Sequence, residues 1–386
     1  MAGILYGWIG IYYGQFAYMF DTWGYHHVSV DEYKLLFHNP SEYFTNIFQS
    51  GYENKFGGFF DSSESWWNDL KGNLFIKVLS IFNIFSFGNY YVNVIFYSFF
   101  TLFGPIAFFR VMNDVFPGKK MQIIFSAFLI PSFLYWTSGI HKDGLVFMAI
   151  SLIIYNFYFA LKEENFSRKR IIIIAISLLI VLAFRNFIFA LLLPALIAWY
   201  YSYQKSKRGI LTYVVVYSFF SLIFFSAKYI SPILDFPQAV VNKQEAFKIL
   251  QGNSGIEMPE LKPTALSFLY NSPKALESTI LRPYPGDVKH LLSLAAATET
   301  IILLLFFLCF LIWRKNGVHS KQFILFCIFF SFSFLLSIGY SVSFLGAIVR
   351  YRSIIIPFLI TPVICLTDWN KLGKIFFNNI NNNANV

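Results

Sequence analysis

Residues 291–313 read LLSLAAATETIILLLFFLCFLIW, and their one charged side chain is Glu299. A helix rises about 1.5 Å per residue, so a segment of this length crosses the roughly 30 Å hydrocarbon core of a bilayer. Runs of 18 or more apolar residues with few charges are typical of membrane-spanning helices. We therefore predict that 291–313 spans a membrane.

The composition of the whole chain agrees with this segment. Of the 386 residues, 57% are hydrophobic and only 13% are charged, and the aromatic residues include 49 Phe and 24 Tyr. Soluble domains carry roughly 25% charged residues. A soluble core of this size cannot bury so much apolar surface. The composition excludes a soluble enzyme, a disordered protein and, despite the net charge of +10, a nucleic-acid-binding protein.

Ten apolar segments are long enough, or nearly so, to cross a bilayer. They are 4–20, 90–112, 121–138, 144–161, 171–184, 187–204, 211–230, 291–313, 322–339 and 353–367. The predicted fold class is therefore an all-α, polytopic transmembrane bundle of about ten spans. The segment 171–184 reaches only about 21 Å, so we expect a locally thin bilayer or a cavity with Arg185 at its mouth. No internal repeat of the kind found in many transporters is visible.

Lysine and arginine are concentrated in alternate short loops. The basic segments are 113–120, 162–170, 205–210, 314–321 and the tail after 367. Short cytoplasmic loops carry an excess of these residues, which predicts that both termini are cytoplasmic. The two long polar segments, 21–89 and 231–290, then lie outside.

The predicted organisation follows from these spans. It comprises a first span 1–20, a first outer loop 21–89, spans within 90–230, a large outer loop 231–290, spans within 291–367 and a cytoplasmic tail 368–386. The first segment has no basic region and no cleavage site, so we expect a retained span. We expect the two outer loops to fold together as a small cap, with an interfacial helix over 73–87 whose Lys77 extends toward the headgroups.

Cations recur at outer span ends, where positive charge is normally scarce. They are His141, Lys142, Arg185, Arg282, Arg350 and Arg352. Each alone is explained by a surface ion pair or by contact with headgroups. Together they oppose the usual charge bias. Because guanidinium and ammonium groups bind phosphate oxygens, the pattern predicts an outer pocket for the phosphate of a lipid carrier.

Acidic residues near the membrane are few. Asp21 follows the first span in the stretch FDTWGYHH and is a candidate base; its alternative role is to end the first helix. The adjacent His26 and His27 lack a second pair of ligands, so no metal site is predicted. Glu299 lies within an apolar span, where a carboxylate indicates either an ion pair with a pocket arginine or a catalytic role.

This arrangement resembles the GT-C superfamily of membrane glycosyltransferases, which use polyprenyl-phosphate-linked sugars; protein O-mannosyltransferases and aminoarabinose transferases are examples. The stretches that carry the resemblance are PSFLYWTSGIHKDGL (131–145), ILRPYPGD (280–287) and RYRSIIIPF (350–358), together with the acid after the first span. O-antigen polymerases share the general build. The likeness covers most of the chain, although its motifs are loose.

The resemblance implies roles for particular residues. It implies that Asp21 is the catalytic base, with Asp31 and Glu32 as alternatives because the family's paired acids are replaced here by Asp-Thr. It also implies that the outer cations hold the lipid phosphate. Some members use a divalent cation, for which this sequence shows no ligand set, and no other cofactor is implied.

The predicted function is an inverting glycosyltransferase of the bacterial cytoplasmic membrane, with its active site facing outward. The partners are the bilayer, a polyprenyl-phosphate-linked sugar and an acceptor that is a glycan, a lipid or a protein. Two alternatives remain: an O-antigen-type polysaccharide polymerase, and a flippase or transporter of lipid-linked glycans. The flippase is disfavoured because the spans carry almost no charged residue except Glu299 to line a path.

Overall fold

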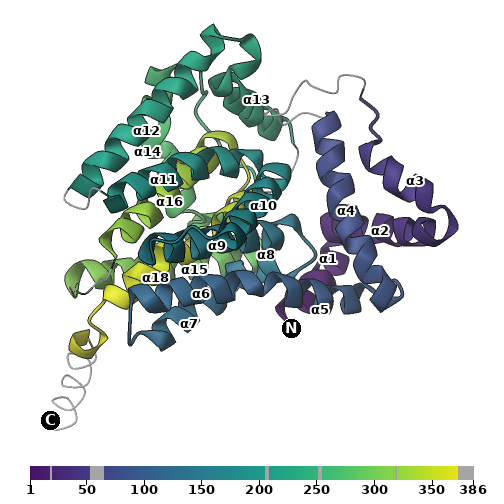
Figure 1. Cartoon of the computed structure of the whole chain (residues 1–386), viewed down its shortest axis with the longest axis horizontal. Helices are drawn as coiled ribbons and strands as arrows, with labels where there is room; N and C mark the ends of the chain where they lie inside the picture. Colours follow the sequence, from purple (N-terminus) through teal and green to yellow (C-terminus); the bar gives the residue numbers. More distant parts are fainter. Residues whose placement is uncertain are drawn as a thin grey trace.

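The computed structural model describes residues 1–17, 20–52, 65–204, 208–250, 254–315, 317 and 320–372, and it describes no side chains for 13–21. Within these residues the chain is helical, with isolated bridges but no strand (Figure 1). The first nine helices are α1 (Ala2–Ala17), α2 (Phe20–His38), α3 (Pro40–Thr45), α4 (Trp66–Ser86), α5 (Tyr90–Thr101), α6 (Phe103–Val115), α7 (Lys120–Phe128), α8 (Pro131–Ser138) and α9 (Lys142–Lys162). The remaining nine are α10 (Arg168–Phe184), α11 (Asn186–Gln204), α12 (Gly209–Ser226), α13 (Phe236–Ile249), α14 (Ala265–Ile280), α15 (Leu291–Ile312), α16 (Lys321–Ser341), α17 (Leu345–Ser353) and α18 (Ile356–Leu366). Short 3₁₀ turns lie at Asn46–Phe48, Ala227–Tyr229, Pro232–Leu234 and Pro285–Asp287.

Six described helical stretches are long and apolar enough to cross a membrane, and eight are if each bent pair counts as one span. The bent pairs are α7–α8, which turn by 52°, and α17–α18, which turn by 63°. Pro131 at the first position of α8 and Pro357 at the second position of α18 favour such bends, because proline lacks the backbone donor that a continuous helix needs. An all-helical protein with several candidate spans is therefore confirmed.

The other two predicted spans correspond to α1 and α10. Both are helical, at 16 and 17 residues, and both are shorter than the six. The predicted apolar segment 171–184 lies within α10, which begins three residues earlier. Ser167 accepts a hydrogen bond from the backbone N–H of Arg170, so the helix begins at Arg168.

Helix α9 lies at the centre of the bundle, packed against α6 and α10, and most of its side chains are buried. Phe133 packs edge to face on Phe147 of α9, and Phe108 packs edge to face on Phe358. Aromatic rings prefer this geometry, and close packing of this kind stabilises helices against one another within lipid. The aromatic-rich composition therefore supplies the interior of the bundle as well as its lipid-facing surface.

The described parts of the segment 21–89 contain the helices α2, α3 and α4, which lie beside α1 and α5 (Figure 1). Helix α4 begins at Trp66, where Ser65 caps it, and packs along α2. Lys77 was predicted to extend toward the lipid headgroups, but the structure shows a different contact. It forms an ion pair with Glu32, lies 3.7 Å from the centre of the Tyr43 ring and is 11% exposed. This lysine joins α2, α3 and α4, because a charge buried among packed helices requires a partner.

The two ends of α9 carry different charges. Lys162 at its C-terminal end pairs with Asp114 at 2.7 Å, and Arg170 in the first turn of α10 pairs with Glu163. Asp143 lies in the first turn, at the other end. We call this the Asp143 end of the bundle. The basic loop 162–170 and the predicted pocket cations are thus separated by the length of α9.

Candidate functional site

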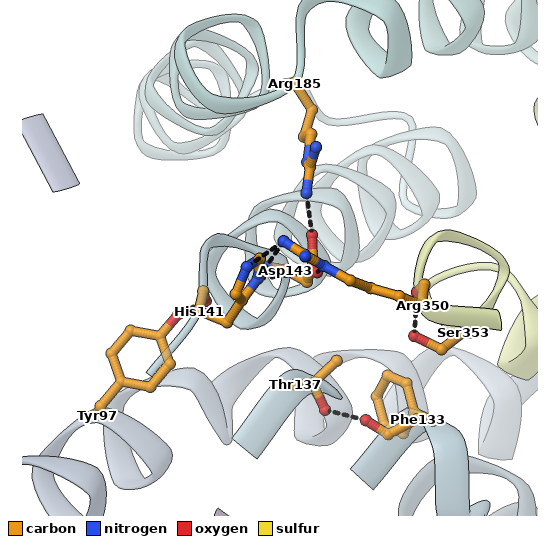
Figure 2. A network of polar contacts seen from close by, with 8 residues as sticks. All are labelled: Tyr97, Phe133, Thr137, His141, Asp143, Arg185, Arg350 and Ser353. Atoms are coloured by element: carbon orange, nitrogen blue, oxygen red, sulfur yellow. Dashed lines mark hydrogen bonds and ion pairs between the residues drawn. The ribbon is translucent and has the colours of Figure 1, made fainter. Parts of the chain in front are cut away.

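A fully buried carboxylate organises the candidate site. Asp143 has no exposed surface, and its two oxygens face different arginines. Arg185 Nη2 lies 2.8 Å from Oδ1, and Arg350 Nε lies 2.9 Å from Oδ2 (Figure 2). A carboxylate has enough lone pairs to accept several such bonds. Asp143 therefore holds two guanidinium groups in one place, although they are 165 residues apart in the sequence.

His141 completes this group, which we call the Asp143 cluster: His141, Asp143, Arg185 and Arg350. Nδ1 of His141 is 2.9 Å from Asp143 Oδ2, and Arg350 Nη2 contacts Nε2. A guanidinium only donates, so Nε2 accepts, and this pattern assigns the ring proton to Nδ1. The Tyr97 hydroxyl donates to the His141 carbonyl and so holds the turn before α9 in place (Figure 2).

Local sequence explains why each member reaches the cluster. Asp143 lies in the first turn of α9, where the helix dipole favours negative charge. Arg185 is the single residue between α10 and α11, and its own N–H still bonds the Val181 carbonyl. Arg350 comes from α17, the short half of a bent pair. All three positions are helix ends or breaks.

The side chains of Arg185 and Arg350 are mostly buried but keep some solvent exposure. Their side chains are 15% and 18% exposed. Arg185 lies 4.7 Å and Arg350 5.7 Å from the centre of the Tyr351 ring, and Arg350 also lies 5.5 Å from the Trp136 ring. Stacking on aromatic rings orients a guanidinium without consuming all of its donors. Arg185 Nε is buried and has no hydrogen-bond partner among the described residues.

Two lysines that the sequence did not single out lie near this cluster. Lys71 belongs to α4 and Lys243 to α13, which come from the two long polar segments. The charges of Lys243 and Arg185 act on Lys71, and Lys243 also acts on Tyr351. Burial, reinforced by these two cations, lowers the pKa of Lys71 to about 8. Cations from the two long polar segments, Lys71 and Lys243, therefore act on the same region as Arg185.

Three of the six predicted phosphate-binding residues converge in the Asp143 cluster: His141, Arg185 and Arg350. Lys142 is half-buried next to them, with its ammonium 5.1 Å from the Tyr25 ring. Asp143 itself was not predicted, although it stands in the quoted stretch. Its signal was an acid at the start of a span, directly after His141 and Lys142.

Arg352 and Arg282 do not reach the cluster. Arg352 is buried and donates to the Thr279 and Arg282 carbonyls and to Thr300 Oγ. Arg282 lies 3.6 Å from Asp287 and 3.8 Å from Glu277. Residues two apart on a helix face different directions, so Arg350 and Arg352 of α17 serve different neighbours. Arg352 joins α14, α15 and α17 instead.

Glu299 is likewise separate from the cluster. Its carboxylate accepts from the backbone N–H and the hydroxyl of Ser132, at 2.6 and 2.5 Å, and it is 7% exposed. Its charge acts on Arg352. Of the two roles predicted for Glu299, the contacts favour the structural one, with Arg352 as the neighbouring arginine.

The three candidate bases differ in what the structure describes. Asp21 lies in the first turn of α2, and its side chain is outside the described residues. Glu32 is engaged by Lys77 and by Asn46, 2.8 Å away. Asp31 is exposed, lies 3.3 Å from Lys34 and borders an open cleft of about 620 Å³. Glu32 is thus held in an ion pair, whereas Asp31 is accessible.

Aromatic and histidine side chains after Asp21 have structural contacts. Trp23 stacks on Tyr90 at 3.8 Å and donates to the Gly7 carbonyl. His26 is buried, bonds the Gly88 carbonyl and has a pKa lowered chiefly by burial. Across the described parts of the chain, no group of three or more His, Cys, Asp or Glu could hold a metal ion.

Comparison of the chain with models of known protein families, with curated proteins and with solved structures finds no match. Functional inference for this protein therefore depends on the geometry of the Asp143 cluster and its surroundings.

Proposed function

We propose that this protein is an integral membrane glycosyltransferase that transfers a sugar from a polyprenyl-phosphate-linked donor to a glycan, lipid or protein acceptor. The observation that supports it is the pair Arg185 and Arg350, oriented by a buried Asp143 at one end of the bundle. Two guanidiniums and one carboxylate leave one positive charge, which matches the single charge of a phosphodiester. Partly exposed arginines at a membrane surface are suited to the phosphate of a lipid carrier.

The proposed topology has ten spans, with α1 and α10 counted as short ones, and places the Asp143 end outside a bacterial cytoplasmic membrane. The basic loop 162–170 then lies on the cytoplasmic side, as the positive-inside rule expects. The segments 21–89 and 231–290 lie outside and together form a cap over the cluster. The proximity of Lys71 and Lys243, one from each segment, supports this cap.

In the proposed reaction the donor enters from the bilayer and its phosphate docks on Arg185 and Arg350. The acceptor hydroxyl attacks the anomeric carbon and gives its proton to Asp21 as general base, with Asp31 as the alternative. The bond between the anomeric carbon and the phosphate oxygen breaks, and the lipid phosphate leaves with the electron pair. Cations held in place before the reaction stabilise the charge that develops on this leaving group.

The donor-binding step is tested with the purified protein in nanodiscs that contain a polyprenyl-phosphate-linked sugar. Arg350→Ala is expected to weaken donor binding by about 2–5 kcal/mol, because it removes an enclosed contact to the phosphate. Lys169→Ala, an exposed change at the opposite end of the bundle, is the control and leaves binding unchanged. Equal donor binding by wild type and Arg350→Ala would overturn the phosphate site.

The chemical step is tested by release of the lipid phosphate with a radiolabelled donor. Asp21→Asn preserves shape and removes basicity, so it is expected to abolish transfer while donor binding persists. Movement of intact donor across the bilayer with no release of lipid phosphate would instead support a flippase. Products that lengthen by whole repeat units would identify a polymerase.

A further inference from the structure

An open cleft of about 620 Å³ lies between the first half of α2 and the start of α5. Its volume is within the range of ordinary ligand pockets. Among its lining residues are the aromatic Trp23, Tyr90 and Tyr91 and the polar His27, Asp31 and Asn89. No lysine or arginine is among the described residues that line it. We call it the α2–α5 cleft, and its lining differs in charge from the Asp143 cluster.

The cleft and the Asp143 cluster lie against different faces of α2. Trp23 lines the cleft and stacks on Tyr90 of α5, with the ring centroids 3.8 Å apart. The ring of Tyr25 instead lies 5.1 Å from the ammonium of Lys142 and packs edge to face on Phe75 of α4. Residues two apart on a helix face different directions. The cleft is therefore a second concave site and not an extension of the cluster.

Polar contacts hold the wall of the cleft in place. Nε2 of His26 lies 3.1 Å from the Gly88 carbonyl oxygen, which ties α2 to the turn before α5. The hydroxyls of Thr22 and Tyr90 lie 2.6 Å apart and join the same two helices. Asn89 accepts from two backbone N–H groups in the first turn of α5. Because the wall is formed in advance, a ligand does not have to order it on binding.

The wall presents rings and hydrogen-bonding groups side by side. Tyr91 and His27 each meet the Trp23 ring edge to face, with centroids 6.1 and 5.9 Å apart. Asp31 lies one turn after His27 on the same face of α2, and its side chain is 77% exposed. Its Oδ1 lies 3.3 Å from the ammonium of Lys34, in a surface pair. A carboxylate accepts more hydrogen bonds than this one.

This combination of groups suits a neutral saccharide. A sugar ring packs its C–H face on aromatic rings, and its hydroxyls bond carboxylates and amides. A phosphate would find no arginine or lysine among the described lining residues, and it would meet the negative charge of Asp31. A cationic ligand would compete with Lys34 for the same carboxylate. The charges of the cleft therefore favour an uncharged ligand that is rich in hydroxyls.

We propose that the α2–α5 cleft is a glycan-binding site that holds a neutral saccharide chain. Tyr91 and Trp23 contact the sugar rings, and Asp31 and Asn89 bond the hydroxyls. This site goes beyond the proposed function and does not require the Asp143 cluster to bind phosphate. Taken together with the proposed transfer reaction, it assigns the acceptor to glycans.

The test uses the full chain in nanodiscs, first on an array of neutral and acidic oligosaccharides. The neutral oligosaccharide that binds most tightly is then titrated by calorimetry. Tyr91→Ala is expected to weaken its binding about tenfold, because a ring that contacts the sugar is lost. Tyr91→Phe keeps the ring and is expected to change binding by less than about threefold. Tyr33→Ala is the matched control, since Tyr33 is also a partly exposed tyrosine but packs on Phe37, outside the described lining of the cleft.

Asp31 separates a saccharide from a cationic ligand. Asp31→Ala is expected to weaken oligosaccharide binding about tenfold, the effect of losing hydrogen bonds to a charged group. Asp31→Asn keeps an acceptor without the charge, so it is expected to lose less than Asp31→Ala. Tetramethylammonium is the cationic probe, because aromatic rings beside a carboxylate also bind quaternary ammonium groups. Binding of tetramethylammonium by wild type, with no oligosaccharide bound, would overturn the proposal.

Two further outcomes would overturn the glycan site: no oligosaccharide on the array binds wild type, or wild type and Tyr91→Ala bind with equal affinity. Tyr91→Ala is expected to keep the wild-type affinity for the lipid-linked donor, because the cleft and the cluster lie on different faces of α2. An equal loss of oligosaccharide and donor binding in this variant would refute a separate site. Oligosaccharide binding that persists in Arg350→Ala would support the cleft whether or not the phosphate site is confirmed.

Discussion

At the scale of single residues, the candidate site depends on Asp143. Its carboxylate accepts from Arg185 and Arg350 and lies 2.9 Å from His141 Nδ1, and none of its surface is exposed. A carboxylate saturated in this way is unsuited to take a proton from a substrate. We therefore interpret Asp143 as a positioning residue that keeps Arg185 and Arg350, the proposed phosphate-binding groups, in place.

Replacing Asp143 by asparagine is expected to destabilise the protein by about 3–5 kcal/mol, because two enclosed guanidiniums lose their counter-charge. Thermal unfolding in detergent measures this change. Asp31→Asn is the control: Asp31 is exposed and pairs only with Lys34 among the partners resolved for it, so little change is expected. An Asp143→Asn protein as stable as wild type would mean that the arginines find other partners.

The lowered pKa of Lys71 leads us to expect that binding of a phosphate lipid depends on pH. Its folded pKa of about 8 lies below its ordinary value of 10.5, so its ammonium is present below about pH 8 and is lost as the pH rises. Binding of a phosphate lipid is therefore expected to weaken between about pH 7.5 and 9.5. Lys71→Arg stays charged throughout and is expected to flatten this profile. Identical profiles for the two proteins would show that Lys71 does not contact the anion.

The lowered pKa of Lys71 affects stability in the opposite direction: without ligand, its contribution to the free energy of unfolding increases with pH. Between about pH 8 and 10.5 the unfolded state binds more protons at Lys71 than the folded state, so this residue's contribution to stability rises with pH. Below about pH 8 both states carry the proton, and the cost of burying the charge is present in full. Comparison of wild type with Lys71→Gln by thermal unfolding at pH 7 and pH 9.5 isolates this contribution.

At the scale of helices, the site is built where helices end. The turn between α8 and α9, the break at Arg185 and the short helix α17 each present a polar side chain from a locally interrupted helix. Gly144 permits the first of these, because a Cβ there would lie 2.4 Å from the Thr137 carbonyl oxygen. The close approach of α8 to α9 therefore requires glycine at this position.

Gly144→Ala is expected to destabilise the protein by about 1–3 kcal/mol, because a backbone atom must move. The shift also moves the turn that carries His141, so phosphate-lipid affinity is expected to fall in the same variant. Gly72→Ala in α4 is the matched control: its Cβ would meet no atom within 4 Å, and alanine favours a helix by up to about 1 kcal/mol. If Gly144→Ala behaves like Gly72→Ala, the contact between α8 and α9 is looser than described.

At the scale of the whole molecule, the two polar segments and the bundle meet at the Asp143 end. Helices α2 to α4 stand beside α1 and α5 (Figure 1). The charges of Lys243 in α13 and of Arg185 at the α10–α11 break act on Lys71 of α4. Lys162, at the opposite end of α9, pairs with Asp114. The protein thus has one end suited to an anion and another with paired charges and basic loops.

The side of the membrane that each end of the bundle faces is tested with single cysteines, in a background without the native Cys309, Cys327 and Cys365. Ser41→Cys and Lys262→Cys are exposed and lie in the two long segments, and both are expected to react with an impermeant reagent in intact cells. Glu164→Cys, in the loop at the opposite end, is expected to react only after permeabilisation. The reverse pattern would place the Asp143 end in the cytoplasm.

The sequence by itself determined that this is a helical protein with several segments long and apolar enough to span a membrane, because segment length and apolar composition are local properties that need no partner. The sequence also showed which cations lie at the ends of the predicted spans, because the loops between apolar segments can be identified one at a time. Each of the ten predicted apolar segments lies largely within helix. Hydropathy alone does not determine the number of spans, because Pro131 and the α17–α18 bend interrupt helices that it treats as continuous.

Only the tertiary structure decided which charges meet. Arg350 and Arg352 are equivalent in the sequence, but one reaches Asp143 and the other joins α14 to α15, because they face different sides of α17. Lys77 was predicted to contact lipid and instead pairs with Glu32. Lys71 and Lys243 gave no signal, since their proximity depends on how two distant segments fold onto the bundle. Side-chain pairing is a non-local property, and a single sequence specifies it only through the completed fold.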